Sequence, residues 1–447
     1  MFCSQNKSDA AFRYSYKTDS LTNERLQMSK FEIIGGQKLH GEVKISGAKN
    51  AALKILPACI LAEDSFHISN VPQIADIEKM IEILRSIGAE ITINNNEIAI
   101  DTKNVNSHKP NPKLIKKLRG SIVLVGPLLA KFGKATFSQP GGCLIGARPI
   151  EDHLDLFAQL GVKIEQEGEN YHLTGKPKAS KVVLNKLSVT ATENAIMATV
   201  LSEGTTRIQV AAAEPEIADL ANFLNKMGAN ISGAGTHEIT VKGVNELKGI
   251  NYSILPDRIE AGTYLIIAIA TNSEITIGPI VSDHLSLVLK KLTSAGAKFR
   301  IVEKNKKEYI VTKPSGQINS IDIDTRTYPG FPTDLQSPFT VLMTKAKGDS
   351  QIFETLFEGR FLFIEELKTM GADIEVLTPH IIQVHGPNRL KGREIISRDL
   401  RGGAALVIAG LIAKGTTTIK DIEYIDRGYE KIDQKLQGLG ASIKRIN

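Results

Sequence analysis

Cys143 is the side chain of this sequence best suited to proton-transfer or covalent chemistry. It follows Gly141 and Gly142 and stands five residues before Arg148. Glycine lets a backbone bend closely over a ligand. A free thiol has a pKa of about 8.5 and, beside a cation, it can donate a proton or act as a nucleophile near neutral pH. Most cysteines are small apolar core residues, so the loop alone leaves a structural role open.

Asp334 and Arg427 also carry groups that could do chemistry, and each has a structural alternative. Asp334 follows a Pro-Thr pair and precedes an apolar segment, a position that is typical of a helix N-cap. Arg427 stands next to Asp426 and three residues before Glu430, so an ion pair within a helix would explain it. A lone Lys or Arg is most often a solvated surface charge.

The composition favours a globular protein that binds an anionic small molecule. Hydrophobic residues make up 42% of the 447 residues and charged residues 23%, which is ordinary for globular proteins. Lys and Arg total 55 against 49 Asp and Glu, and this net charge of +6 is too diffuse to indicate nucleic acid. The basic run at 304–307 is too short for nucleic-acid binding and is typical of a hairpin tip.

The cysteines, histidines and apolar runs argue against three further classes of protein: disulfide-rich, metal-binding and membrane-spanning proteins. The three cysteines, Cys3, Cys59 and Cys143, are odd in number and far apart, so we expect no disulfide framework and a cytoplasmic location. The nine histidines are scattered, and no cluster has metal-ligand spacing, so we expect no metal and no cofactor. No apolar run approaches the roughly 18 residues of a membrane helix, so no membrane partner is expected.

The first 30 residues are polar and lack the apolar core of a secretory signal. We expect residues 1–30 to form a disordered N-terminal extension. Met28 directly precedes the first strand-like segment, so translation starting at Met28 remains an alternative.

A six-fold internal repeat fixes the elements that must position these side chains. Six helical segments end in a glycine followed by alternating apolar residues, which predicts a left-handed C-cap and then a strand. The six glycines are Gly88, Gly161, Gly228, Gly296, Gly371 and Gly440.

Upstream of each glycine, the repeat predicts an apolar helix and a strand. The helices are apolar on most faces and should be buried. They are expected at 51–61, 121–129, 194–201, 264–270, 339–343 and 404–412, followed by strands near 66–68, 135–137, 206–208, 275–277, 351–353 and 417–419. Six βαβαββ units in one chain divide as three plus three, so we predict an α/β fold of two domains with sheets outside and apolar helices inside.

Six motifs follow one another along the chain: Ile45–Leu53, the Gly142–Pro149 loop, Glu214–Ile217, Leu255–Glu260, Phe331–Asp334 and Ile425–Glu430. Together they make the chain resemble the UDP-N-acetylglucosamine 1-carboxyvinyltransferase family of enolpyruvyl transferases, in the EPSP synthase superfamily. The resemblance runs from about Phe31 to Ile446. The related 3-phosphoshikimate 1-carboxyvinyltransferase is the alternative; it is disfavoured because it carries a Gly-Ser-Lys-Ser type motif in place of residues 47–50 and lacks the cysteine loop. The resemblance implies a two-domain inside-out α/β barrel.

The resemblance also implies the domain boundaries. The chain would cross between domains twice, near Lys49 and near Pro256. One domain would be residues 49–255, which carries the Cys143 loop, and the other would combine residues 31–48 with 256–447.

By the same resemblance, phosphoenolpyruvate is bound by cations from several parts of the chain, and arginine suits its phosphate and carboxylate because of its planar fork. The implied contacts are Lys49, Asn50, Arg148, Arg401 and Arg427.

UDP-N-acetylglucosamine is the second substrate that the resemblance implies. The positions that match its binding residues are Arg119, Arg148, Pro149, Ile150, Glu151, Asp152, Lys186, Leu187, Ser188, Val189, Asp334 and Leu356. The sequence departs from the family at Glu151, where aspartate is usual, and at Thr190, where glycine is common. The first could shift a contact, and the second could tighten the loop that holds the diphosphate.

The implied reaction is addition followed by elimination. Cys143 protonates the methylene carbon of phosphoenolpyruvate, the sugar 3-hydroxyl attacks with help from Asp334, and phosphate leaves, while Lys49 and Arg427 stabilise charge. The resemblance also implies that fosfomycin alkylates Cys143. A non-catalytic binding protein that kept the fold is the other alternative.

Overall fold

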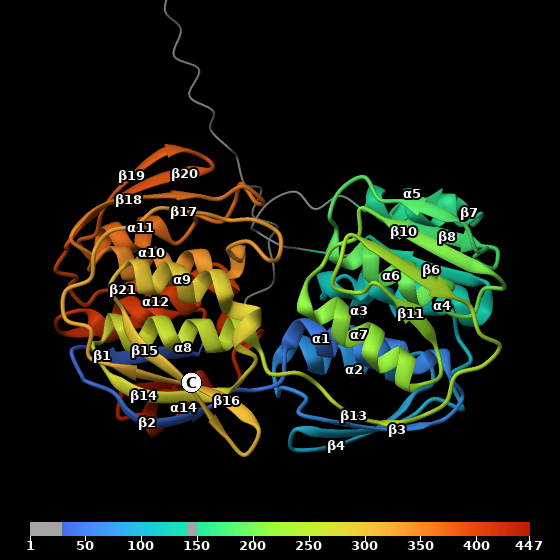
Figure 1. Cartoon of the computed structure of the whole chain (residues 1–447), viewed down its shortest axis with the longest axis horizontal. Coiled ribbons are helices and arrows are strands. Elements are labelled where there is room, and N and C mark those ends of the chain that lie inside the picture. The colour runs from blue at the N-terminus through green and yellow to red at the C-terminus, as the bar shows by residue number, and fades with distance from the viewer. Residues whose placement is uncertain (1–28, 140, 142–149) are drawn as a thin grey trace, which may run out of the picture.

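The computed structural model describes residues 29–139, 141 and 150–447. These residues form two lobes that lie side by side (Figure 1). Each lobe has its own apolar core: the buried core residues of the first lobe lie between Ala48 and Ile254, and those of the second lie in 31–45 and 259–443. Of the predicted N-terminal extension, residues 1–28 lie outside the described residues, and so does the loop with Cys143, Arg148 and Pro149. Its last two residues, Ser29 and Lys30, are described, and Lys30 is the first residue of the strand Lys30–Ile34.

Six apolar helices fill the two cores. Because they are apolar on most faces, they are buried almost throughout; in the helix at 400–412, for example, every residue from Arg401 to Leu411 is buried. They are α1 (Lys49–Ala58), α4 (Val125–Phe132), α6 (Val189–Thr199), α8 (Arg258–Ala270), α10 (Gln336–Met343) and α12 (Leu400–Ile412). The predicted buried helices are confirmed, and most begin several residues earlier than predicted.

Six further helices are amphipathic, and each ends two or three residues before a predicted glycine. They are α2 (Ala75–Arg85), α5 (Glu151–Gln159), α7 (Pro215–Lys226), α9 (Ser286–Ser294), α11 (Ile364–Thr369) and α14 (Ile432–Gly438). All six glycines have positive φ, from +78° at Gly161 to +112° at Gly228, so the predicted left-handed C-caps are confirmed. The remaining helical segments are η1 (Cys59–Leu61), α3 (Pro112–Ile115), η2 (Arg119–Leu124), η3 (Ser282–Leu285), η4 (Thr333–Leu335) and α13 (Glu423–Asp426).

The described residues form six sheets, three in each lobe. The first lobe has the orders β13-β3-β5-β4, β6-β8-β7 and β11-β12-β10-β9, with β3 (Ser65–Ser69), β4 (Glu90–Asn94), β5 (Glu97–Asp101), β6 (Lys134–Ser138), β7 (Lys163–Glu167), β8 (Asn170–Thr174), β9 (Lys181–Val183), β10 (Thr205–Gln209), β11 (Asn230–Ser232), β12 (Glu238–Lys242) and β13 (Asn251–Ser253). The second lobe has the orders β15-β16-β14-β2, β17-β18-β20-β19 and β21-β22-β1-β23, with β1 (Lys30–Ile34), β2 (His40–Lys44), β14 (Glu274–Ile280), β15 (Lys298–Lys304), β16 (Lys307–Lys313), β17 (Ile323–Asp324), β18 (Gly348–Phe353), β19 (Asp373–Thr378), β20 (Ile381–Gly386), β21 (Glu394–Ile396), β22 (Thr416–Lys420) and β23 (Ser442–Ile446).

Two repeats depart from the predicted βαβαββ order. The second repeat lacks its first strand in the described residues: Thr136 bonds to His108 O at 3.0 Å, but Pro110 and Pro112 lie in this segment and cannot donate to a ladder. The sixth repeat contributes one strand after α14, and β1 from the start of the chain completes its sheet.

The chain crosses between the lobes twice, and the two crossings are paired. Strand β2 pairs with β14 in the second lobe, whereas β13 pairs with β3 in the first. Between them, Ala48 N donates to Leu255 O at 2.8 Å and Asp257 N donates to Ser46 O at 2.9 Å. This pairing brings the N-termini of α1 and α8 together at the junction of the lobes.

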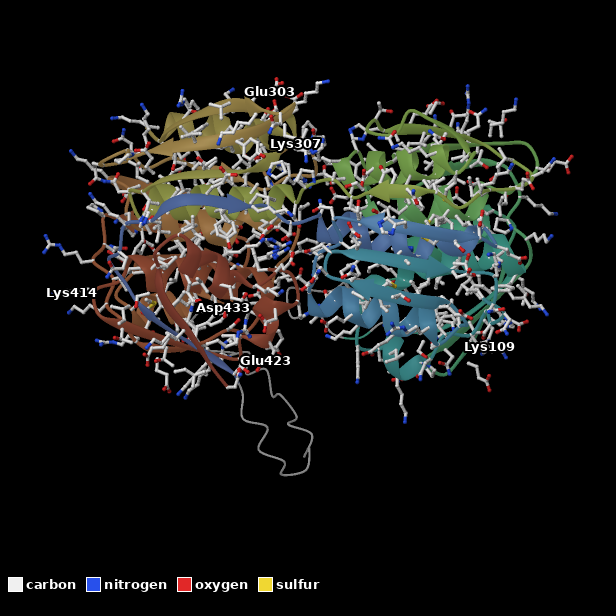
Figure 2. The ribbon with its side chains drawn as sticks, turned by 90° about the horizontal axis from the view of Figure 1, so that it is seen from below. Lys109, Glu303, Lys307, Lys414, Glu423 and Asp433 are labelled. Atoms are coloured by element: carbon white, nitrogen blue, oxygen red, sulfur yellow. The ribbon has the colours of Figure 1, made fainter. Side chains whose placement is uncertain are left out.

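Charged side chains are spread over both lobes. Lys109 lies on one lobe, and Lys307 and Lys414 lie on the other (Figure 2). The basic run at 304–307 forms the turn between β15 and β16, with Asn305 and Lys306 at positive φ, so the predicted hairpin tip is confirmed. No helix in the described part of the chain has the length and apolarity to cross a membrane.

Candidate active site

A cavity of about 710 Å³ lies between the lobes. Polar side chains from both lobes line it. From the first lobe they include Lys49, Asn50, Asp76, Arg119, Asp152, Lys186 and Ser188, and from the second Asp334, Arg360, Arg401 and Arg427. The structure therefore brings most of the predicted site residues to one place.

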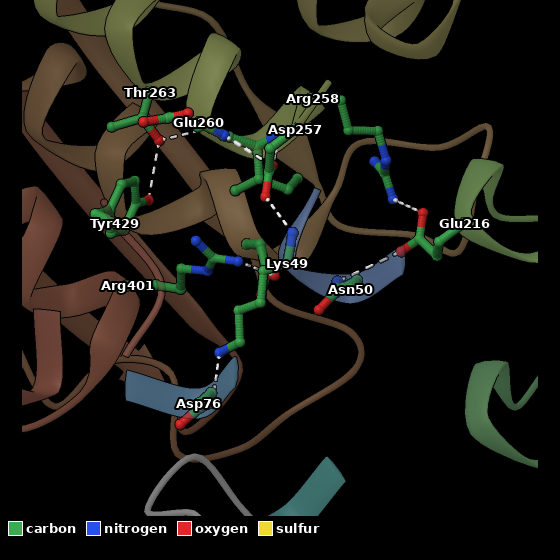
Figure 3. A network of polar contacts seen from close by, with 12 residues as sticks. Lys49, Asn50, Asp76, Glu216, Asp257, Arg258, Glu260, Thr263, Arg401 and Tyr429 are labelled. Carbon is green, nitrogen blue, oxygen red and sulfur yellow. Dashed lines mark hydrogen bonds and ion pairs between the residues drawn. The ribbon is translucent and has the colours of Figure 1, made fainter. Parts of the chain in front are cut away.

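Lys49 and Arg427 meet on the carboxylate of Asp76. Lys49 begins α1 and its Nζ lies 2.7 Å from Asp76 Oδ2 (Figure 3), while Arg427 Nε lies 2.9 Å from Asp76 Oδ1. Burial favours the neutral form of Asp76, but the two cations outweigh it and hold its pKa below the usual value. The alternative that Arg427 forms an ion pair with a neighbouring acid of its own helix is wrong. The ion pair that the structure describes for Arg427 is with Asp76, and Asp426 pairs with Arg445 instead.

Burial lowers the pKa of Lys49, and the nearby charges of Arg401 and Arg427 lower it further. The carboxylate of Asp76 opposes these effects and favours the charged ammonium. Three cations therefore converge on one end of the cavity, and the buried carboxylate of Asp76 pairs with two of them, Lys49 and Arg427.

Asp334 is held between two arginines and does not cap a helix. Arg360 Nη2 lies 2.5 Å from its Oδ1 and Arg401 Nη2 lies 2.9 Å from its Oδ2. Burial alone would raise the pKa of Asp334, but Arg401 and Arg360 hold it far below its usual value. The helix-capping interpretation is wrong, since the residue before α10 is Leu335 and that helix has no side-chain cap.

Arg401 is fixed by its own helix and by an aromatic ring. Asp399 caps α12 by accepting hydrogen bonds from Arg401 N and Gly402 N, both at 2.9 Å. The guanidinium carbon of Arg401 lies 5.3 Å from the centre of the Tyr429 ring. The Tyr429 hydroxyl is bonded in turn to Thr263 at 3.0 Å (Figure 3).

Asn50, the residue after Lys49, contacts an acidic segment that contains Glu214 and Glu216. Its Nδ2 donates to Glu216 Oε1 at 3.4 Å, and Arg258 Nη2 lies 3.7 Å from Glu216 Oε2 (Figure 3). Beside it, Glu214 Oε1 accepts a hydrogen bond from Tyr328 N at 3.3 Å. Arg258 and Tyr328 belong to the second lobe, so these contacts cross between the lobes.

The other end of the cavity lies in the first lobe. Arg119 begins η2 and lines the cavity with Leu187, Ser188 and Val189. Lys186 Nζ pairs with Asp152 Oδ2 at 2.7 Å. Ser188 caps α6.

The remaining predicted site residues differ in whether they line the cavity. Leu356 lines the cavity and is 36% exposed. Ile150 is buried and Glu151 is exposed at the start of α5, and the described lining includes neither. Their predicted contacts, like those of Cys143, Arg148 and Pro149, stay predictions.

Sequence reasoning missed Asp76, Arg360 and His153, all of which line the cavity. Asp76 looks like an ordinary acid in the first turn of an amphipathic helix, and Arg360 stands alone among aromatic residues. No spacing signal links either residue to its partners, because those partners lie far away in the chain. Among residues 29–139, 141 and 150–447, no group of three or more His, Cys, Asp and Glu could hold a metal ion.

Comparisons with known proteins agree on one family. Residues 33–436 match the model of the EPSP synthase (3-phosphoshikimate 1-carboxyvinyltransferase) family. UDP-N-acetylglucosamine 1-carboxyvinyltransferase 2 of Carboxydothermus hydrogenoformans is 46% identical over 422 residues, which cover 94% of this chain and 100% of the relative. UDP-N-acetylglucosamine 1-carboxyvinyltransferase of Coxiella burnetii is also 46% identical and covers 94% of this chain, with 96% of its own length covered.

Solved structures support the same fold. The enolpyruvyl transferase NikO from Streptomyces tendae superposes with a TM-score of 0.83 at 24% identity, covering 94% of this chain and 99% of its own. An EPSP synthase from Acinetobacter baumannii gives a TM-score of 0.73 at 18% identity and covers 94% of this chain and 100% of its own. At these identities the likeness shows the fold alone.

Proposed function

This chain belongs to the UDP-N-acetylglucosamine 1-carboxyvinyltransferases within the EPSP synthase family, and we propose that it transfers the enolpyruvyl group of phosphoenolpyruvate to the 3-hydroxyl of UDP-N-acetylglucosamine. Phosphate is released. The observation that carries the proposal is the cavity between the lobes, in which Lys49, Arg401 and Arg427 converge next to Asp334. The protein is thus a transferase with the two-domain α/β fold of enolpyruvyl transferases.

Phosphoenolpyruvate binds at the cationic end of the cavity. Its phosphate and carboxylate need several donors, and arginines supply them in pairs. Lys49 comes from the first lobe and Arg401 and Arg427 from the second, so the substrate would be held from both sides. Asn50 stands next to Lys49, and Arg148 completes the set.

UDP-N-acetylglucosamine binds from the first lobe toward Asp334. Arg119 and Lys186 supply positive charge for its diphosphate, and Leu187, Ser188 and Val189 form the wall around it. The sugar then extends to the Asp334 carboxylate on the other lobe.

The two substrates and the side chains of this protein account for every bond and proton of the proposed reaction. The Cys143 thiol gives a proton to the methylene carbon of phosphoenolpyruvate, and the sugar 3-oxygen forms a bond to the adjacent carbon while its own proton passes to a base. The tetrahedral intermediate then returns a proton from its new methyl group to the Cys143 thiolate, the carbon–oxygen bond to phosphate breaks, and an enol ether remains. The leaving phosphate takes up the proton that the base had accepted. The cations stabilise the charge that develops on phosphate.

Asp334 is ionised, as a base must be, but its pairing with Arg401 and Arg360 lowers its pKa and makes it a weak base. When substrate oxygens recruit Arg401, the carboxylate loses part of this stabilisation and its pKa rises toward the normal value. Asp334 therefore first orients the sugar 3-hydroxyl and then accepts its proton.

We also place the protein in the cytoplasm at the first committed step of peptidoglycan synthesis, with fosfomycin as an inhibitor that alkylates Cys143. The domain boundaries at 48/49 and 255/256 belong to the same proposal. They are supported by the separate apolar cores of the two lobes and by the paired crossings.

Phosphate release from phosphoenolpyruvate tests the proposed function. We expect release with UDP-N-acetylglucosamine and none with shikimate 3-phosphate. Release with shikimate 3-phosphate alone would identify the other branch of the family, and release with neither acceptor by the folded protein would favour a binding role.

A further inference from the structure

His153, on α5, contacts two residues of α6 from a buried position. Its Nε2 lies 3.1 Å from Thr190 Oγ1, and its Nδ1 lies 3.0 Å from Asn194 Nδ2. Thr190 and Asn194 are four residues apart and so lie on one face of α6. Both His153 and Thr190 line the cavity between the lobes.

The hydrogen bonds of Asn194 fix which ring nitrogen of His153 carries the proton. Asn194 Oδ1 accepts from Gly126 N at 2.8 Å, and its Nδ2 donates to Ile122 O at 3.0 Å, so the orientation of the amide is set by two backbone groups. The same Nδ2 faces His153 Nδ1, which must therefore accept. In a neutral ring the proton then sits on Nε2 and is donated to Thr190 Oγ1.

Burial, together with nearby cations, lowers the pKa of His153 and favours the neutral ring. Burial lowers its pKa to about 4, and the cations Arg119 and Lys186 act in the same direction, while Asp152 opposes them. At neutral pH the ring thus has one donor and one acceptor, and both are used.

The Thr190 hydroxyl is left with a proton to donate. A hydroxyl carries one hydrogen and two lone pairs, and Thr190 already accepts from His153. Its bond to His153 is the only hydrogen bond of this side chain to the part of the chain that the structure describes. Since Thr190 is half-buried and lines the cavity beside Lys186 and Ser188, its proton is free for a ligand there. Accepting one bond also strengthens the bond that a hydroxyl donates.

We propose that Thr190 is a specificity-determining residue for the nucleotide substrate: its hydroxyl, oriented by His153, donates a hydrogen bond to an oxygen of the diphosphate. The proposal rests on the proposed function, which places a nucleotide diphosphate between Arg119 and Lys186. A hydrogen bond to a charged oxygen is stronger than one between neutral groups.

Two matched variants separate the hydroxyl from the shape of the side chain. Thr190→Val keeps the branched side chain and removes the hydroxyl, while Thr190→Ser keeps the hydroxyl. In titrations with UDP, we expect Thr190→Val to bind about tenfold more weakly and Thr190→Ser to stay within about threefold of wild type. Uridine, which has no phosphate, should bind all three proteins equally. In the full reaction, the KM for UDP-N-acetylglucosamine should rise in Thr190→Val and that for phosphoenolpyruvate should not.

A second measurement does not depend on any variant. Nitrogen-15 NMR of the wild-type protein should show the His153 proton on Nε2. A proton on Nδ1, UDP binding by Thr190→Val equal to wild type, or an equal loss of uridine and UDP affinity would each overturn the proposal. A wild-type protein that binds UDP in this hydroxyl-dependent way but transfers no enolpyruvyl group would contradict only the proposed function.

Discussion

Asp76 separates two cations of the cavity that would otherwise repel each other. It lies between Lys49 and Arg427, and its charge counteracts the burial that lowers the pKa of Lys49. The substrate brings its own negative charge, so we infer that Asp76 positions the two cations and keeps Lys49 protonated for binding.

This inference predicts a pH effect in Asp76→Asn. Removing the carboxylate removes the influence that raises the pKa of Lys49, so this pKa falls further. Since the ammonium form binds phosphoenolpyruvate, kcat/KM for phosphoenolpyruvate is lost as pH rises through this pKa, and the alkaline limb of the profile should move to lower pH. Glu78→Gln, an equal charge change at an exposed position of α2, is the control. Superimposable profiles of Asp76→Asn and wild type would contradict the role.

A second prediction concerns the thiol of Cys143. If its thiol is the proton donor, Cys143→Ser should lower kcat by about 100-fold or more, because a hydroxyl is a far weaker acid. Cys143→Asp should stay active with an optimum at lower pH, because a carboxylic acid donates only where it is protonated.

Cys59 provides the comparison for Cys143. It is buried, its Sγ donates to Ile55 O at 3.3 Å, and burial raises its pKa. Cys59→Ala should therefore lower stability without moving the pH profile, and fosfomycin should label Cys143 alone. A folded Cys143→Ser enzyme with wild-type turnover would rule out the donor role.

The paired crossings position the start of α1, which carries Lys49, against the second lobe. Asp257 caps α8 by accepting from Ile259 N at 2.7 Å, and its other oxygen accepts from Lys49 N at 3.1 Å. One carboxylate thus ties the starts of α1 and α8 together, and the site is built on rigid helix ends.

Gly47 lies in the crossing where no side chain fits. A Cβ on Gly47 would lie 1.6 Å from Asn70 O. Gly47→Ala must therefore shift the backbone, and we expect a loss of about 1–3 kcal/mol in the free energy of unfolding, measured as a lower Tm. Gly438→Ala is the control, because its Cβ would meet nothing within 4 Å and the residue lies in a helix. Equal Tm values for the two variants would show that the crossing tolerates a side chain.

Local sequence patterns predicted the repeated helices and strands well. They could not predict contacts between segments that are distant in the sequence. The glycines after the helices and the apolar helices follow from backbone freedom and burial, which act within a few residues. The exchange of β2 and β13 between sheets of the two lobes depends on pairing between segments that lie far apart in the chain. The same reason applies to Asp76 and Arg360, whose partners are brought near only by the fold. Motifs pointed to Lys49, Asp334 and Arg427, and the family resemblance pointed to Arg401.

Residues of both lobes line the cavity, and the two lobes are joined by two crossing segments. Arg119 and Lys186 lie in the first lobe, while Asp334 and Arg401 lie in the second. A substrate that contacts both sets gains interactions when the lobes approach, so its binding should favour a closed form.

Small-angle scattering measures this closure. We expect the radius of gyration to fall when UDP-N-acetylglucosamine is added at saturation, and to stay unchanged with uridine, which reaches only the first lobe. Identical scattering of the free and the saturated protein would contradict a closing cleft.

If this cavity joins phosphoenolpyruvate to the sugar 3-oxygen of the nucleotide, the nucleotide product must carry that bond, and identifying the product is the decisive experiment. The purified protein is incubated with both substrates, and the nucleotide product is analysed by mass spectrometry and NMR. We predict one enolpyruvyl ether on the 3-oxygen for each phosphate released. Phosphate release with an unmodified nucleotide sugar, or attachment at another oxygen, would contradict the account.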